Sequence, residues 1–188
     1  MQATSESVHP VFVIVGPPAV GKSTTSKALA ARFPKSLHIP VDDIRTMVVS
    51  GLVLPSATWS DELTHQIALA RASVTHMALA YRAAGFVAVI DDFWDPSFHL
   101  DYQALLDQPH THKVLLYPQQ EEAHRRNFTR SGDTPARGYI DEGIRIVYQQ
   151  LSDGMPQWSH EGWLVMDTTT LSVEETVEII LQRTAPTP

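Results

Sequence analysis

The sequence contains no cysteine, which excludes disulfides, thiolate nucleophiles and cysteine-ligated metal sites. It also lacks any apolar run near the roughly eighteen residues that a membrane-spanning helix needs. Acidic residues outnumber basic ones: the chain has 14 Lys and Arg and 21 Asp and Glu, which gives a net charge of −7. This balance argues against non-specific binding of nucleic acid through a basic face. Residues 1–10 are polar and do not resemble a signal peptide, so we expect a disordered lead-in and a cytoplasmic protein.

Strand-like and helix-like stretches alternate along the 188 residues, of which 43% are hydrophobic. Apolar runs typical of buried strands lie at 11–15, 37–41, 86–90, 113–117 and 164–167, and helical patterns at 24–33, 61–84, 121–130, 139–151 and after Ser172. This alternation predicts an α/β fold, a three-layer doubly wound sheet of about five parallel strands. We expect a single domain at residues 11–183, followed by a disordered tail at 184–188.

The most informative motif is the phosphate-binding loop G-x-x-x-x-G-K-[ST] at residues 16–23. Its glycines allow successive N–H groups to converge on an anion, and the helix that follows adds its positive end. Lys22 would reach the β- and γ-phosphates, and the Ser23 hydroxyl would face Mg²⁺. The motif therefore predicts ATP and Mg²⁺ as ligands, with nucleotide contacts from Gly16, Pro17, Pro18, Ala19, Val20, Gly21, Lys22, Ser23 and Thr24.

Acidic residues follow the second strand, where a doubly wound sheet binds its ligands. In a kinase, a carboxylate beside the acceptor hydroxyl can orient it and take its proton, and we assign this role to Asp42. Arg45 could hold an anionic part of the acceptor through its two-pronged guanidinium. The alternative is that Asp42 or Asp43 only caps the helix that follows.

A second acidic pair follows the third strand. Asp91 is our candidate Mg²⁺ ligand, while Asp92, Phe93 and Trp94 would line an acceptor pocket. The sequence leaves open which of the two carboxylates faces the metal. It also leaves open whether they are plain loop carboxylates and whether the aromatic rings belong to the core.

A cluster of arginines predicts a lid at about residues 125–138. Arg126 and Arg130 lie near the end of a helix, and a flexible stretch at 131–137 follows them. Arginines that close over a transferring phosphoryl group stabilise its charge and exclude water. The alternative is a solvated helix end, where the helix dipole favours cations, and whether Arg137 belongs to the lid stays open.

Together these motifs resemble the small phosphate-loop kinases around polynucleotide 5′-hydroxyl kinase, with chloramphenicol phosphotransferase and zeta-type toxin kinases as broader relatives. The resemblance spans residues 11–181 and rests on the 16–23 loop, Asp42-Asp43-x-Arg45, the acidic strand end and Arg126-Asn127-x-x-Arg130. It implies that Asp42 is the general base, that Arg45 contacts an acceptor phosphate, and that both lid arginines grip the ATP phosphates. Unlike the polynucleotide kinases, this chain lacks a basic track, and its segment 48–59 is apolar.

Our leading hypothesis is an ATP-dependent phosphotransferase that acts on a hydroxyl of a small molecule and has no membrane partner. One alternative is a polynucleotide 5′-hydroxyl kinase, which Arg45 favours and the net charge opposes. Another is a regulatory protein that binds or hydrolyses ATP without an acceptor. A GTPase-type switch does not fit, because the only asparagine, Asn127, lies in the arginine motif. The sequence indicates neither the acceptor nor the oligomeric state.

Overall fold

A computed structural model of the chain describes residues 9–55, 59–95, 98–152 and 155–185. The expected lead-in and tail therefore lie mostly outside the described residues, although Thr184 still belongs to the last helix. No helix in the described ranges is long and apolar enough to cross a membrane.

A sheet of five strands, all parallel, forms the centre of the protein and confirms the predicted fold. The strands are β1 (Val11–Gly16), β2 (Ser36–Pro40), β3 (Val87–Phe93), β4 (Thr111–Leu116) and β5 (Trp163–Met166), in the order β2-β3-β1-β4-β5. In this register Val15 lies beside Asp92, and Pro40 lies beside Asp91. The carboxyl ends of β1, β2 and β3 therefore meet at one edge of the sheet.

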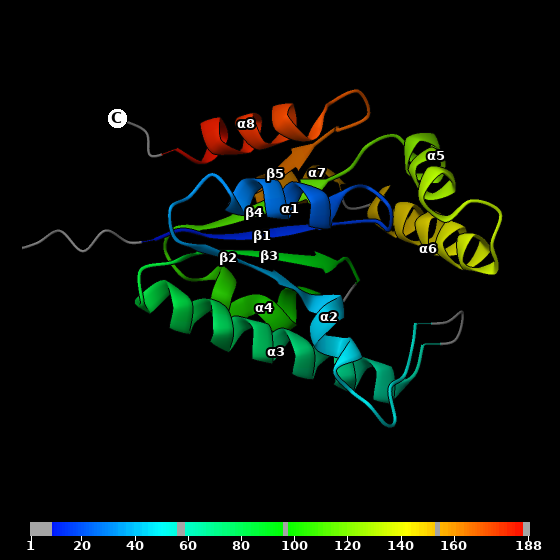
Figure 1. Ribbon diagram of the computed structural model, residues 1–188, viewed down its shortest axis with the longest axis horizontal. Helices are drawn as coiled ribbons and strands as arrows, with labels where there is room; N and C mark the ends of the chain where they lie inside the picture. The colour runs from blue at the N-terminus through cyan, green and yellow to red at the C-terminus, as the bar shows by residue number, and fades with distance from the viewer. Residues whose placement is uncertain (1–8, 56–58, 96–97, 153–154, 186–188) are drawn as a thin grey trace, which may run out of the picture.

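Helices cover both faces of the sheet (Figure 1). One face carries α1 (Lys22–Ala30) and α8 (Val173–Thr184), and the other carries α3 (Asp61–Ala83) and α4 (Phe98–Leu106). Near the carboxyl ends of the strands lie α2 (Val41–Thr46), α5 (Gln120–Ser131) and α6 (Pro135–Ser152), and α7 (Met155–His160) precedes β5. The sequence offered a helix after Asp42 and Asp43 only as an alternative, and it did not reveal α4 or α7; α2 and α7 are only 6 residues long, too short for a helical period to show.

The central strand β1 is buried at every position, as its unbroken apolar sequence predicts. Because successive side chains point to opposite faces, Val13 packs into the core beneath α3 and α4, while Ile14 packs into the core beneath α1 and α8. At the start of α8, Ser172 and Glu175 form a capping box.

The stretch expected to be flexible at 131–137 is mostly helical. α5 continues to Ser131 and α6 begins at Pro135, a residue whose fixed φ suits the first position of a helix. The buried Asn127 side chain joins the two helices by donating hydrogen bonds to Arg137 O (3.1 Å) and Asp141 Oδ1 (2.9 Å). Helices α5 and α6 therefore form one hydrogen-bonded unit.

Candidate nucleotide and acceptor site

The phosphate-binding loop has the backbone geometry that its glycines predict. Gly21 has φ 96°, and Ala19 also adopts the left-handed conformation with φ 63°. At Gly16 a Cβ would lie 2.4 Å from the carbonyl oxygen of Leu116, so any side chain there would collide with the backbone of β4. A loop of this conformation before the amino end of a helix can turn successive N–H groups toward a phosphate.

Lys22 folds back across this loop. Its ammonium donates hydrogen bonds to Gly16 O (3.0 Å) and Pro17 O (2.8 Å). Burial lowers the pKa of Lys22, while the negative charges of Asp42, Asp91 and Asp92 oppose that change. The Lys22 ammonium therefore lies among carboxylates and carbonyls. This is the place where the phosphates of a nucleotide would bind.

Asp91 is the carboxylate that faces the phosphate-binding loop. Ser23 Oγ donates a hydrogen bond to Asp91 Oδ1 (3.0 Å), and His38 Nε2 contacts the other carboxylate oxygen. A hydroxyl and a carboxylate oxygen are suitable ligands for Mg²⁺. Since the described residues contain no cluster of three or more metal-binding side chains, a cation here would take its remaining ligands from phosphate and water. His38 was missed because only the pairing of β2 with β3 brings it to Asp91.

Asp92 lies behind the site rather than in it. Its fully buried carboxylate forms an ion pair with Nε of Arg71 on α3, at 2.6 Å. Arg71 also pairs with Asp95 (2.5 Å) and Asp101 (2.9 Å). Burial raises the pKa of Asp92 to about 6, although the charge of Arg71 lowers it. The predicted contact of Asp92 with an acceptor is therefore replaced by its ion pair with Arg71.

The expected acceptor groups gather at α2. The Asp42 side chain is 71% exposed and accepts a hydrogen bond from Arg45 Nη1 (3.2 Å), whose own side chain is only 6% exposed. The guanidinium of Arg45 lies 5.5 Å from the centre of the Phe93 ring. Trp94 lies in the core instead, with its ring centre 5.8 Å from that of Trp158. Arg45 thus contacts both Asp42 and the Phe93 ring, whereas Trp94 packs in the core.

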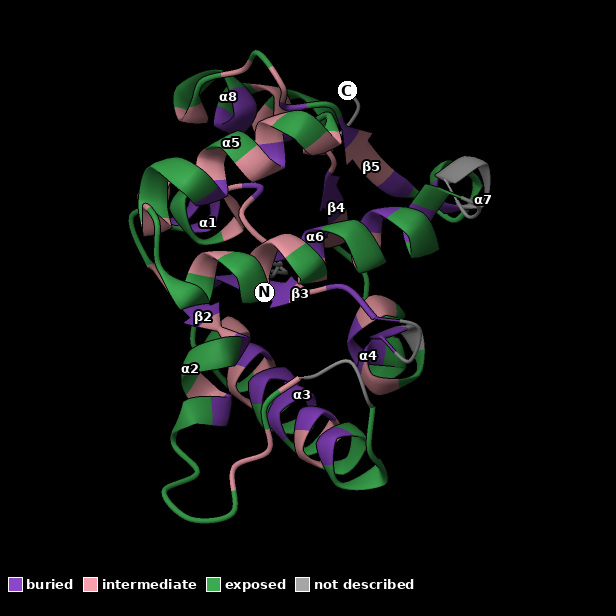
Figure 2. Cartoon of the chain, turned by 90° about the vertical axis from the view of Figure 1, so that its right-hand side faces the viewer, coloured by how far each residue is buried: buried purple, intermediate pink, exposed green. Residues whose placement is uncertain are grey.

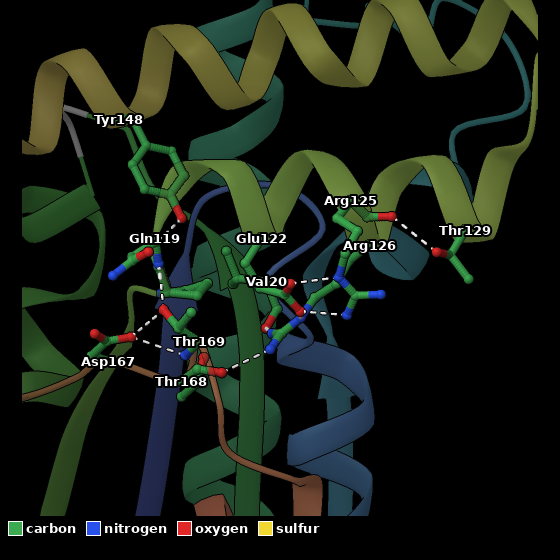
Figure 3. A network of polar contacts seen from close by, with 11 residues as sticks. Val20, Gln119, Glu122, Arg125, Arg126, Thr129, Tyr148, Asp167, Thr168 and Thr169 are labelled. Carbon is green, nitrogen blue, oxygen red and sulfur yellow. Dashed lines mark hydrogen bonds and ion pairs between the residues drawn. The ribbon is translucent and has the colours of Figure 1, made fainter.

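Arg126 binds protein carbonyls rather than projecting freely (Figure 3). Its Nη1 donates to Val20 O (2.9 Å) in the phosphate-binding loop, and its Nη2 donates to Thr168 O (2.7 Å) beyond β5. Hydrogen bonds from Arg125 and from Arg126 lower the pKa of their common partner Glu122 to about 2. Arg126 therefore ties α5 to both loops, and its expected contact with ATP phosphates stays a prediction.

The two other lid candidates differ from Arg126. Arg130 is exposed and interacts with Lys22 through its charge. Arg137 belongs to α6, where it pairs with Asp133 (3.2 Å) and lies over the Phe128 ring at 5.5 Å. Of these two residues, Arg130 is the one whose cation is close enough to influence the phosphate-binding loop.

A cavity of about 650 Å³ opens between the phosphate-binding loop, α5 and the start of α8. Its walls include Gly21 and Thr24 at the start of α1, Arg126 and Arg130, and the stretch 168–173. The cavity therefore lies directly beside the phosphate-binding loop. Thr168, Thr169 and Thr170, just beyond β5, line this cavity.

The family model described as AAA domain (AAA_33) matches residues 11–142, more than half of the chain. The chain belongs to this family. No curated protein matches the sequence. The finer resemblance to polynucleotide kinases stays a prediction.

Solved structures of kinases have a similar fold. A gluconokinase from Sinorhizobium meliloti 1021 aligns with a TM-score of 0.63 at 15% identity, over 94% of this chain and 92% of that one. A shikimate kinase from Bacteroides thetaiotaomicron aligns with a TM-score of 0.63 at 17% identity, over 93% and 97%. A tunicamycin resistance protein from Deinococcus radiodurans aligns with a TM-score of 0.62 at 17% identity, over 95% and 97%. At these identities the likeness establishes the fold.

Proposed function

We propose that this protein is an ATP-dependent phosphotransferase that moves the γ-phosphate of ATP to a hydroxyl of a small acceptor. The observation that carries the proposal is the position of Asp42. Its exposed carboxylate lies at the edge of the sheet where the strands end, interacts through its charge with Lys22 of the phosphate-binding loop, and is paired with Arg45. The family and the kinase fold support the same reaction class.

In the proposed reaction, the acceptor oxygen forms a bond to the γ-phosphorus while the bond from phosphorus to the β-γ bridging oxygen breaks. ADP leaves with that electron pair, and the acceptor proton passes to Asp42. Lys22 would leave the carbonyls of Gly16 and Pro17 to neutralise charge on the β- and γ-phosphates. Mg²⁺, held by Ser23 and Asp91, would supply further charge neutralisation.

The unit of α5 and α6 would act as the lid of a single kinase domain at residues 11–183. Arg126 already fixes α5 to the phosphate-binding loop, so the positioning of the lid would depend on this residue. Arg130, which is exposed, would turn toward the transferring phosphoryl group and stabilise its charge.

Arg45 favours an acceptor that carries an anionic group. Its Nε is buried without a hydrogen-bond partner among the described residues, and a buried guanidinium N–H gains by binding an oxyanion. Two structural neighbours, gluconokinase and shikimate kinase, bear the names of hydroxylated carboxylic acids. We therefore propose a small hydroxylated acid as the acceptor, ahead of a nucleic-acid 5′ end.

The test is transfer of label from γ-labelled ATP, with Mg²⁺, to a panel of hydroxylated acids and to a 5′-hydroxyl oligonucleotide. We expect label on a small acid, reduced by roughly 10²- to 10⁴-fold in Asp42→Asn while ATP affinity is kept. Asp43→Asn is the matched control, because it removes the next exposed carboxylate of the same helix. Label on the oligonucleotide alone would overturn the choice of acceptor, and equal rates in both variants would overturn the role of Asp42.

A further inference from the structure

A hydrogen bond joins α6 to a distant segment on the acceptor side. Tyr139, in the first turns of α6, donates its hydroxyl to Pro55 O at 2.6 Å. Pro55 belongs to residues 47–55, which follow α2 and which we call the acceptor segment. The Tyr139 phenol also interacts electrostatically with Arg45 and with Asp42. It therefore lies beside the two side chains that the proposed function assigns to the acceptor.

Within the described part of the chain, few hydrogen bonds fix the acceptor segment. Its large side chains Met47, Val49 and Leu54 are 70%, 100% and 63% exposed, so burial in a core does not position them. The side chain of Gln66 on α3 holds the backbone of the segment. It donates a hydrogen bond to Gly51 O (2.8 Å) and accepts one from Val53 N (2.9 Å).

Arg45 adds a weaker hydrogen bond to the acceptor segment, from Nη2 to Val53 O at 3.3 Å. Since few hydrogen bonds from the described residues hold the segment, losing the one from Tyr139 should have a measurable effect.

Other residues of α6 are attached to the nucleotide site. Asn127 ties α6 to α5, and Arg126 ties α5 to Val20 O of the phosphate-binding loop. A Cβ on Gly143 of α6 would lie 3.4 Å from Cγ of Pro18, so the helix passes directly over that loop. Figure 2 shows α6 crossing the carboxyl ends of the strands, with α5 above it and α2 below. One helix thus spans both halves of the site.

We propose that the Tyr139–Pro55 hydrogen bond couples the two halves, so that binding of a nucleotide orders the acceptor segment around Arg45. Phosphates bound to the loop bias the position of α5 and α6, and Tyr139 transmits that bias to the segment. Tyr139 is therefore a positioning residue. This inference rests on the proposed function, because it assumes that a nucleotide binds at the 16–23 loop and an acceptor beside Arg45.

The test is hydrogen–deuterium exchange of the full chain, with and without Mg²⁺ and the β,γ-imido analogue of ATP. In the wild type, we expect the nucleotide to slow amide exchange both in peptides covering 16–24 and in peptides covering 47–55. In Tyr139→Phe, protection at 16–24 should persist. Amide exchange at 47–55 in the nucleotide-bound state should be roughly 2- to 10-fold faster than in the wild type, which is the change expected from the loss of one hydrogen bond.

Tyr148→Phe is the matched control. Tyr148 also donates from α6 to a proline carbonyl at 2.6 Å, but its partner is Pro118 at the end of β4. This variant should keep the wild-type response at 47–55. Equal responses of the wild type and Tyr139→Phe at 47–55, or an equal loss in both variants, would overturn the coupling. Absence of protection at 16–24 in the wild type would instead refute the proposed function.

Discussion

Arg71→Met tests whether the buried charges behind β3 stabilise the fold. Arg71 is completely buried and pairs with three carboxylates, those of Asp92, Asp95 and Asp101. It also donates a hydrogen bond to the backbone oxygen of Phe93. Methionine keeps much of the volume but leaves the carboxylates without their shared cation. Removing one partner of a buried ion pair costs about 3–5 kcal/mol, a large part of the roughly 5–15 kcal/mol by which a domain is stable.

The loss should depend on pH. The folded-state pKa of Asp92, about 6, lies above the unfolded value of 3.8, so the native state holds the extra proton and wild-type stability falls as pH rises through this window. Without Arg71 the pKa of Asp92 rises further, because the charge that lowered it is gone. The decrease in the free energy of unfolding of the variant relative to the wild type should therefore be largest at pH 8. It should be smaller at pH 5, where the carboxyls are protonated and need no cation beside them.

Urea unfolding followed by fluorescence measures the effect, since the chain has 4 tryptophans. At pH 8 we expect the midpoint to fall by roughly 1–3 M, given a slope of about 2 kcal/mol/M. Arg32→Met is the matched control, because it removes only a surface pair with Glu178 and should change stability by less than about 1 kcal/mol. A deficit below about 1 kcal/mol at pH 8, or the same deficit at pH 5 and pH 8, would refute the reasoning.

Two further predictions concern the phosphate-binding loop. Lys22→Met should abolish ATP turnover while leaving the circular dichroism spectrum and unfolding midpoint near those of the wild type, and wild-type turnover would contradict the assigned role. Gly16→Ala should weaken nucleotide binding and lower stability by about 1–3 kcal/mol, because the added Cβ would lie 2.4 Å from Leu116 O. Gly138→Ala, in a helix with open space around the position, is its control and should be neutral or stabilising in the same unfolding and binding assays.

The phosphate-binding loop and the parallel sheet were predictable because their signals are local. The glycines, the lysine and the preceding apolar strand occur in one short stretch, and each strand is a short apolar run. The same locality explains the prediction of α3 and of the helix after Ser172. The short helix α2 was only an alternative for the opposite reason: its 6 residues leave no periodic signal, and its place depends on packing near α3.

The partners of the charged side chains were not predictable, because they come from distant parts of the chain. His38 reaches Asp91 across 53 residues, and Arg126 reaches Val20 across 106. A propensity for strand or helix carries no information about such pairs. Arg126 shows the consequence: its motif indicated a mobile phosphate contact, whereas the fold gives it backbone carbonyls to bind.

One pairing, however, follows from the period of a strand. Ala88 and Ile90 of β3 pack toward α3, while Val87 and Val89 pack toward α1. Continuing this alternation turns Asp91 toward α1, where it meets Ser23, and turns Asp92 toward α3, where it meets Arg71. Two adjacent aspartates thus have different environments because a strand presents them to opposite layers. A lone arginine in the apolar stripe of α3 was therefore the signal that one of these carboxylates is buried.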